Sequence, residues 1–255
     1  MTKGFQDNTR QVLQVSGADR IKFLQDLVTN DLAHLSNGAV YAALLSPQGK
    51  YLFDFFLVKA DDSILLDVAA DRAAALAQRL TMYRLRADVQ IEMADENVWR
   101  GLGDLPGGAL ADPRDAAMGW RFYGVQAPKF APLDPAELNA LRIEHIIPES
   151  GAELVVDGTY ILEAGFERLN GVDFRKGCYV GQEITARMKH KTELKKGLVK
   201  VSVTGDVPAT GTEITADGKP VGTLFTVVNG TGLAHLRFQR AKGDMQAGDA
   251  VVRLA

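Results

Sequence analysis

The chain has 255 residues, of which 46% are hydrophobic and 24% are charged, and its formal net charge is −3. This composition excludes a disordered chain and is typical of a folded globular protein. The slightly negative charge argues against a general nucleic-acid binder. Cys178 is the only cysteine, so the chain alone can form neither a disulfide nor a zinc or iron–sulfur site built from several cysteines. We therefore predict no resident metal.

The chain start and the apolar runs give a prediction of location. Residues 1–7 are polar and lack the apolar stretch of a secretory signal. The longest apolar runs, such as residues 64–66, are far shorter than a membrane span. A single cysteine suits a reducing compartment. We predict a cytoplasmic protein without a membrane partner.

The N-terminal part predicts a mixture of helices and strands. Residues 16–19 resemble a helix N-cap with an acid in the first turn, and apolar residues at helical spacing continue this helix to about residue 30. Alternation then predicts strands, with a Pro-Gly turn at 46–50. The elements predicted next are strands at 41–45, 51–58 and 63–68, a helix at 72–82 and a strand at 89–93. This order is typical of an α+β sheet layer.

The second half begins with a different pattern. Residues 101–119 are rich in Gly, Pro, Ala and Asp and predict a surface loop, since Pro106 and the spacing disagree with a dinucleotide-binding loop. A helix begins after Asp134, with proline in its first turn, and ends before Pro148. From residue 197 the pattern is all strand, with turn signals every 8–12 residues, which indicates a small barrel or sandwich. The strands predicted there are 198–203, 213–215, 221–228 and 250–254.

The most unusual segment is 176–183, which reads Lys-Gly-Cys-Tyr-Val-Gly-Gln-Glu. Its two glycines free the backbone to turn tightly or to approach a ligand. A helix is predicted from about Gln182, so Cys178 lies just before a helix N-terminus and close to Arg175 and Lys176. Both features favour a thiolate. A buried, inert cysteine is the alternative, and it stays open at this point.

Charge is concentrated around this segment. Residues 175–196 contain seven Lys or Arg and two acids, which gives this stretch +5 and leaves −8 for the rest of the chain. Glu183 and Arg187 are spaced to pair on one helix face. The basic stretch is either a solvated helix face and loop or an electropositive rim for an anionic ligand or partner, and charge alone does not separate these interpretations.

The octapeptide resembles the signature of the YgfZ family, Lys-Gly-Cys-Tyr-x-Gly-Gln-Glu, at all seven fixed positions. This family includes bacterial proteins and their mitochondrial iron–sulfur assembly relatives. Segments elsewhere in the chain are also similar to the family, namely 15–19, 23–31, 44–50, 142–144, 147–149 and 171–174.

The resemblance implies an α+β fold like that of the glycine-cleavage aminomethyltransferases, in which three domains form a ring with a small C-terminal β-barrel. On this basis we expect residues 1–195 to form a folate-binding region of two interleaved α+β domains and residues 196–255 to form the barrel. The resemblance also implies tetrahydrofolate as the cofactor. It further implies a role in assembly or repair of iron–sulfur proteins, including tRNA-modifying methylthiotransferases, with folate and iron–sulfur client or assembly proteins as partners.

The resemblance also suggests site residues. Cys178 and Lys176 are the catalytic candidates, and any cluster bound by Cys178 must be shared, because one thiolate cannot hold a cluster. A pterin needs an acid or amide for its N–H edge and an aromatic face, while the glutamate tail of folate suits Lys or Arg. The cofactor-binding candidates are Asn30, Tyr179, Gln182, Glu183 and Arg187.

The sequence leaves two other functions to be weighed against this role. A folate-dependent aminomethyltransferase or one-carbon transferase is disfavoured, because Phe53 replaces one of the paired acids of those enzymes and Asp54 alone remains. We therefore do not expect a conventional enzyme. Direct tRNA contact through residues 175–196 would be salt-dependent, but the segment does not interleave aromatic and basic residues as an RNA platform does. The four histidines are scattered without the spacing of metal ligands and are interpreted as surface or packing residues.

Overall fold

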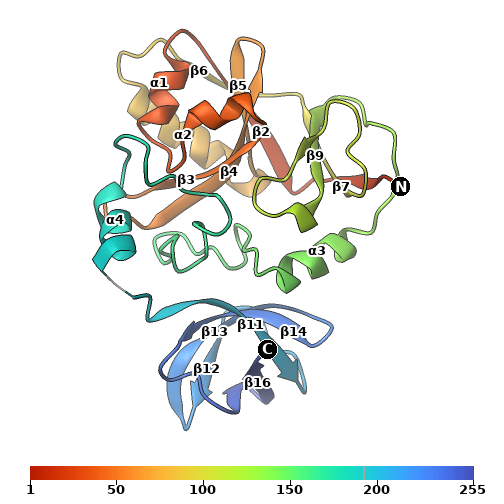
Figure 1. Ribbon diagram of the computed structural model, residues 1–255, viewed down its shortest axis with the longest axis vertical. Helices are drawn as coiled ribbons and strands as arrows, with labels where there is room; N and C mark the ends of the chain where they lie inside the picture. Colours follow the sequence, from red (N-terminus) through yellow and green to blue (C-terminus); the bar gives the residue numbers. More distant parts are fainter. Residues whose placement is uncertain (192) are drawn as a thin grey trace.

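The computed structural model describes residues 1–191 and 193–255, and the side chain of residue 191 lies outside the described part. The described chain forms two five-stranded sheets and a closed six-stranded barrel. Figure 1 shows these as three lobes, with the barrel below the two sheets and the segment between α3 and α4 running through the middle. No helix in the described ranges is long and apolar enough to cross a membrane.

The first sheet has the order β3-β4-β5-β2-β6. Its strands are β2 (Arg10–Ser16), β3 (Val40–Leu45), β4 (Tyr51–Ala60), β5 (Ser63–Ala69) and β6 (Gln90–Met93). Helices α1 (Arg20–Gln25) and α2 (Ala73–Arg84) and the 3-10 helix η1 (Leu32–Ser36) belong to this lobe. Its core joins apolar residues of the sheet, such as Leu44 and Leu66, to Leu24 of α1 and Leu76 of α2. The predicted strands from 41 to 93 and the helix at 72–82 are confirmed to within about two residues.

The first predicted helix is much shorter than expected. Ser16 belongs to β2, Asp19 makes no side-chain cap, and α1 ends at Gln25 instead of near residue 30. Beyond α1 the backbone joins the sheet, because Thr29 N donates to the Ala43 carbonyl over 3.0 Å. Leu27 and Val28, which suggested a longer helix, are buried in the core, but Leu27 lies in a turn and Val28 forms a β-bridge with Leu44.

The second sheet has the order β10-β1-β7-β9-β8. Its strands are β1 (Lys3–Gln6), β7 (Asn97–Leu102), β8 (Leu110–Ala111), β9 (Trp120–Gly124) and β10 (Ala131–Pro132). The prediction of a loop over 101–119 is therefore wrong in part, since it contains the end of β7, all of β8 and the 3-10 helix η3 (Ala116–Met118). Gly101 of β7 permits close packing, because a Cβ there would lie 2.2 Å from the Trp120 ring.

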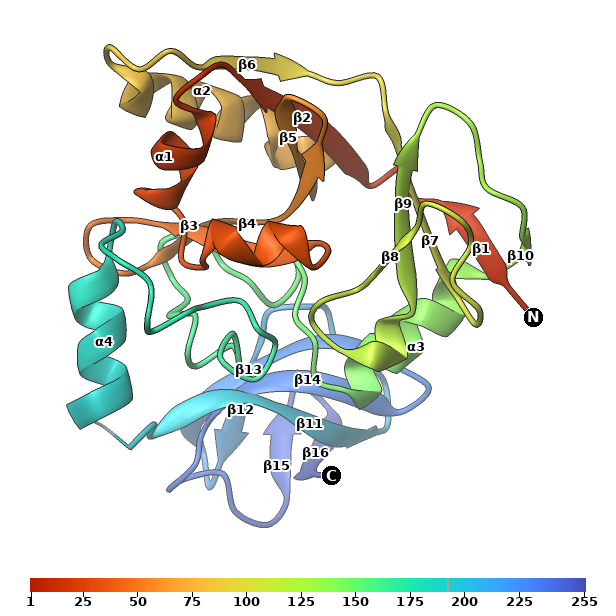
Figure 2. The same cartoon turned by 45° about the horizontal axis from the view of Figure 1, so that its top comes forward.

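Helix α3 (Pro135–Glu144) begins as predicted. The Asp134 carboxylate accepts a hydrogen bond from Ala136 N over 2.9 Å, and Pro135 occupies the first turn. The aspartate side chain accepts a hydrogen bond from a backbone N–H that has no partner within the helix. Proline suits the first turn because it has no backbone N–H to satisfy. The helix packs beneath the second sheet and faces the barrel, as Figure 2 shows.

The barrel closes in the order β11-β14-β13-β12-β15-β16. Its strands are β11 (Lys196–Thr204), β12 (Thr212–Ala216), β13 (Lys219–Val228), β14 (Thr231–Arg237), β15 (Met245–Ala247) and β16 (Ala250–Leu254). The sequence pattern missed β14 and β15. The sequence does contain a signal for the hairpin before β14, which is the pair Asn229-Gly230. Both residues adopt the positive φ that a tight two-residue hairpin turn requires.

Polar contacts hold the barrel against the middle of the molecule. The buried Glu163 carboxylate lies 3.1 Å from His235 Nε2 and 3.5 Å from Lys196 Nζ, both on barrel strands. Arg142 of α3 donates to the Thr226 hydroxyl over 3.0 Å. These contacts fix the barrel beside the segment that leads into the octapeptide.

Candidate functional site

The octapeptide lies at the surface between the first sheet and helix α4 (Gln182–Lys191), with its cysteine in solvent. Cys178 and Gly177 are both exposed. A Cβ added at Gly177 would meet no heavy atom within 4 Å. The alternative of a buried, inert cysteine is therefore wrong, and a partner molecule can reach this stretch of backbone and the thiol.

Lys176 anchors this exposed loop from below. It is 6% exposed, and its ammonium donates to the Gln25 carbonyl over 2.6 Å and to the Val28 carbonyl over 2.5 Å. The Gln25 carbonyl lies at the end of α1, where a cation is favoured by the helix dipole, and the Val28 carbonyl lies three residues beyond it. Burial lowers the pKa of Lys176 to about 8, although Asp31 and other nearby acids oppose the shift. The ammonium thus faces the protein interior and holds the loop to α1.

Gly181 closes the other end of the loop. Its φ is +81°, and a Cβ there would lie 2.6 Å from the Ser46 carbonyl oxygen and 3.0 Å from Gly49 Cα. Gly49, in the turn between β3 and β4, has φ +72° and in turn lies against Ile184 of α4. Two glycines therefore let the hairpin turn and the start of α4 approach more closely than any side chain would allow.

The remaining octapeptide residues have different environments. Tyr179 is 8% exposed and packs in the core between the sheet and the middle segment, with Lys176 Nζ 5.2 Å from its ring centroid. Gln182 begins α4 and is partly exposed, whereas Glu183 and Arg187 are exposed on the helix. Among the described ion pairs, none joins Glu183 to Arg187.

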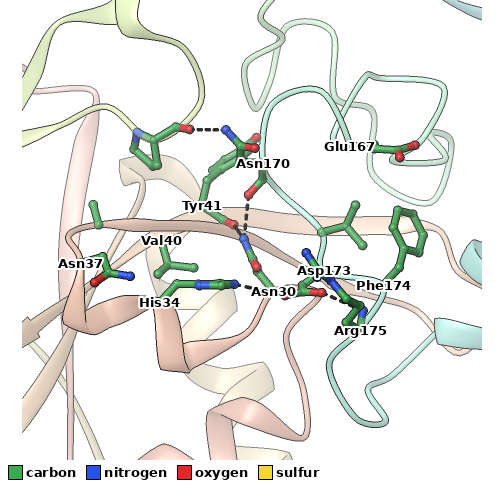
Figure 3. Close-up of a pocket in the computed structure, with 13 residues that line it drawn as sticks. Asn30, His34, Asn37, Val40, Tyr41, Glu167, Asn170, Asp173, Phe174 and Arg175 are labelled. Atoms are coloured by element: carbon green, nitrogen blue, oxygen red, sulfur yellow. Dashed lines mark hydrogen bonds and ion pairs between the residues drawn. The ribbon is translucent and has the colours of Figure 1, made fainter.

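A cavity of about 480 Å³ opens next to this loop. It lies between the segment after α1, strand β3 and the middle segment (Figure 3). Of the predicted cofactor-binding residues, Asn30 lines it, and Tyr179, Gln182, Glu183 and Arg187 do not. The loop contributes Arg175, three residues before Cys178. The thiol and the cavity are therefore neighbouring sites on one loop, and Cys178 does not line the cavity.

Asn30 shapes the cavity wall. Its amide donates to the Tyr41 carbonyl over 2.8 Å and to the Asn170 carbonyl over 2.7 Å (Figure 3). Its oxygen accepts from Asp31 N over 2.8 Å. These three bonds occupy most of the hydrogen-bonding capacity of the side chain. Asn30 thus ties the segment after α1 to β3 and to the middle segment.

Asp173 and His34 are cavity residues that sequence reasoning did not select. Asp173 accepts from Arg175 N over 2.7 Å, and its other oxygen lies 3.1 Å from His34 Nε2 (Figure 3). Burial alone would raise the pKa of Asp173, but these hydrogen bonds and the nearby positive charge lower it, so it is ionised. The sequence offered a signal for Asp173, because segment 171–174 resembles the family. It offered none for His34, because the partner of His34 is 139 residues away in the chain.

The acid in the first sheet, Asp54, does not line this cavity. Asp54 is 2% exposed and accepts from the Tyr41 hydroxyl over 3.0 Å and the Tyr51 hydroxyl over 2.8 Å. Burial and this carboxylate raise the pKa of Tyr41 well above its usual value. Phe53 packs in the core of the first sheet, with the Arg72 guanidinium over its ring. Neither side chain of this pair presents a carboxylate to the cavity.

The basic stretch is partly neutralised. Lys189 forms an ion pair with Glu167 on the cavity rim, and Lys196 pairs with Glu163. Arg175 and Arg187 are exposed and take part in none of the described ion pairs. The positive rim is therefore weaker than the residue count suggested. The side chain of Lys191 lies outside the described residues.

Comparisons with known proteins agree with this architecture. The model of the CAF17 C-terminal beta-barrel domain matches residues 195–255. The crystal structure of the glycine cleavage system aminomethyltransferase T from Bartonella henselae has the same fold, with a TM-score of 0.72 over 98% of this chain and 84% of that one, at 13% identity. The expected aminomethyltransferase-like α+β fold with a closed C-terminal barrel is thus confirmed.

Comparison with related sequences assigns the chain to a more specific family. The chain is 31% identical to the mouse protein named iron–sulfur cluster assembly factor IBA57, mitochondrial, and 32% identical to its human counterpart, in each case over 94% of this chain and 79% of the relative. A Neurospora crassa homologue is 32% identical over 82% of this chain and 55% of its own length. The prediction of a cytoplasmic location is wrong by these relatives, which are named as mitochondrial proteins. The extent and level of identity show that the chain belongs to the family of the iron–sulfur cluster assembly factor IBA57.

Proposed function

We propose that this chain is an iron–sulfur cluster assembly factor that presents the Cys178 thiolate to a cluster shared with a partner protein. The observation that carries the proposal is the exposed thiol on a loop held rigidly at both ends, in a chain of the IBA57 family. Lys176 has a positioning role here, because its ammonium holds the loop to the end of α1.

The geometry suits a shared ligand. An exposed thiol with a glycine before it leaves room for a second protein to bring its own thiolates to the same iron. One thiolate from this chain needs about three further ligands, since iron–sulfur clusters are typically held by four. Among the described residues there is no group of three or more His, Cys, Asp or Glu arranged to hold a metal. The remaining ligands therefore come from the partner.

The test is reconstitution with a separately purified cluster-carrying assembly protein. Iron and sulfide should co-elute with both proteins, and the visible spectrum of the mixture should differ from that of the carrier alone. Cys178→Ser should abolish the change without loss of thermal stability, because the side chain is exposed. Gln182→Asn, beside the same helix start, is the control. An unchanged spectrum and iron content with Cys178→Ser would remove the thiol from the proposal.

We also propose that the cavity beside the loop binds a tetrahydrofolate-type cofactor, as the YgfZ-like octapeptide suggests. Its volume of about 480 Å³ falls in the range of small-molecule sites. Asp173 offers carboxylate oxygens for a pterin N–H edge, Phe174 an aromatic face and Arg175 a cation for the glutamate tail. These three types of group match those that a folate requires.

This assignment replaces part of the predicted ligand set. Asp173, Phe174 and Arg175 take the roles first expected of Glu183, Tyr179 and Arg187. The test is a titration of the purified protein with tetrahydrofolate by calorimetry. Asp173→Asn should weaken binding about tenfold or more, because a charged hydrogen bond is lost. Asp61→Asn makes the same change in the turn between β4 and β5 and should have no effect. Equal affinities of the two variants would contradict the proposal.

The two sites connect through one segment. Asp173 and Arg175 line the cavity, and Lys176–Cys178 follow directly. Folate bound to Asp173 and Arg175 would restrain the chain that carries the thiol. This provides a physical reason for one protein to combine a folate-sized cavity with an exposed cysteine. One-carbon transfer is disfavoured, because Asp54 accepts from two tyrosine hydroxyls and does not line the cavity.

A further inference from the structure

A second hollow lies apart from the octapeptide and from the cavity beside it. Two adjoining cavities of about 330 and 190 Å³ share Thr9 and Glu149. They lie where β2, β7 and the start of the middle segment meet α3, on the side of the molecule where β7 and α3 are seen in Figure 2. We call this the arginine hollow, and its charged and hydroxyl residues are Asp7, Thr9, Arg10, Asp71, Arg100, Arg142, Glu149 and Ser150.

Arg100 has unused donors in this hollow. The residue is 6% exposed, and its Nη1 donates to Asp7 over 3.0 Å and to Glu149 over 3.4 Å. Within the described ranges 1–191 and 193–255, neither Nε nor Nη2 of Arg100 donates a hydrogen bond, and neither is among the sealed side-chain atoms without a partner, so both can be reached from the hollow. A guanidinium whose remaining donors face a cavity can bind an acceptor that enters it. The smaller cavity, which Arg100 lines, is where such an acceptor would bind.

Glu149 is a loosely held counterion. Its carboxylate lies 3.4 Å from Arg100 and 3.8 Å from Arg142, and its side chain is 34% exposed. The neighbouring pair of Arg142 with Glu153 is 3.0 Å long, and Glu153 is fully buried. Ion pairs of this kind are normally about 2.7–2.9 Å long. Glu149 therefore makes weak contacts that an external anion can replace.

The surrounding charges favour a negative ligand. Burial lowers the pKa of Arg100, and Arg121 and Arg114 lower it further, whereas the carboxylates of Glu149 and Asp7 oppose the shift. Burial alone would raise the pKa of Glu149, but Arg100 and Arg142 outweigh it, and the pKa of Glu149 is below its usual value. An additional negative charge beside Arg100 would be stabilised by the same positive field.

We propose that the arginine hollow binds a small molecule through an oxyanion, either a carboxylate or a phosphate group. Arg100 holds the oxyanion through its free Nε and Nη2, and the ligand displaces Glu149 from Arg100. A guanidinium presents adjacent donors in a plane, which match the two oxygens of a carboxylate or phosphate. The larger cavity, with the hydroxyls of Thr9 and Ser150, accommodates the rest of the molecule.

The hollow takes part in neither proposed function of the octapeptide region. Its lining residues and those of the cavity in Figure 3 do not overlap. Its occupation can therefore be tested without folate, iron or a partner protein.

The experiment follows the Arg side-chain Nε–Hε resonances of the full chain by NMR. Inorganic phosphate and acetate are titrated separately, with chloride keeping the ionic strength constant. Arg100→Lys assigns the Arg100 signal. We expect a saturable shift of that signal with at least one of the two anions, and this also tells which oxyanion the hollow prefers. Arg253, which pairs with Asp244 on the barrel surface, is the internal control and should not move.

Glu149→Gln provides a second, independent measurement. Removing the internal carboxylate should tighten anion binding about tenfold, because the ligand no longer competes with a negative charge at 3.4 Å. Glu144→Gln removes the same charge from the end of α3 outside the hollow and should leave the affinity unchanged. No shift of the Arg100 signal with either anion overturns the proposal, as does an unchanged affinity in Glu149→Gln. If Glu149→Gln does not fold, the wild-type titration decides alone.

Discussion

The two glycines of the octapeptide give the sharpest test of how this loop is built. Gly181 has φ +81°, and a Cβ there would lie 2.6 Å from the Ser46 carbonyl oxygen. Gly177 has an ordinary φ, and a Cβ there would meet nothing within 4 Å. The same change to alanine, four residues apart, should therefore have very different effects on the free energy of unfolding.

The magnitude follows from two terms. A residue with a Cβ in left-handed backbone costs about 1–2 kcal/mol. The contact with Ser46 adds about 1–2 kcal/mol of overpacking, because its neighbour is backbone and cannot turn aside. Gly181→Ala should thus lower the free energy of unfolding by about 2–4 kcal/mol. This lowers the melting temperature of a chain of this size by about 5–10 °C. Gly177→Ala should change the free energy of unfolding by no more than about 0.5 kcal/mol.

The assay is urea unfolding followed by tryptophan fluorescence and far-UV circular dichroism, with melting temperatures by calorimetry. Cluster binding with the carrier protein should be measured on the same samples. If cluster binding fails in the stable Gly177→Ala variant, the partner backbone approaches this position directly. Equal stabilities of the two variants, or a less stable Gly177→Ala, would refute the description of Gly181 as a close contact between the hairpin turn and α4.

Further predictions concern charge and packing. Burial lowers the pKa of Lys176 to about 8 from its ordinary 10.5, so between these values the unfolded chain binds more protons and stability should rise with pH; urea titrations from pH 7.5 to 10 should show this rise in the wild type and not in Lys176→Met. Glu163→Gln should lower the free energy of unfolding by about 1–3 kcal/mol and loosen the barrel, because His235 and Lys196 lose their shared carboxylate. Hydrogen exchange should increase in β11 and β14 before the rest of the barrel, and uniform protection of all barrel strands would contradict this. Gly101→Ala should lower the melting temperature by several degrees, since its Cβ would lie 2.2 Å from the Trp120 ring, and unchanged stability would contradict the packing described for the second sheet.

The octapeptide could be recognised from the sequence because its information is local. Seven fixed residue types within eight positions match a family signature regardless of what the chain does elsewhere. The helix after Gly181 and the N-cap of α3 at Asp134 were predictable for the same reason, because capping and helical spacing act within a few residues. The strands of the first sheet were also predictable, since alternation and the turn at 46–50 lie in a continuous stretch.

The cavity residues were not predictable in this way. His34 meets Asp173 across 139 residues, and the Lys176 ammonium meets Val28 across 148. The residue types alone do not reveal these partners, because histidines and lysines are also common on surfaces that have no functional role. The same holds for Arg100 and Glu149, which come together only when β7 and the middle segment pack beside α3.

By itself the sequence determined the family signature, the single thiol and the local helix and strand patterns. These depend on interactions between residues that are near in the chain. Only the tertiary structure decided that the thiol is exposed, that Lys176 faces inward and that Asp173 and Arg175 line the cavity in place of Tyr179, Glu183 and Arg187. Burial and the direction of a side chain depend on segments far apart in sequence, and no local pattern contains them.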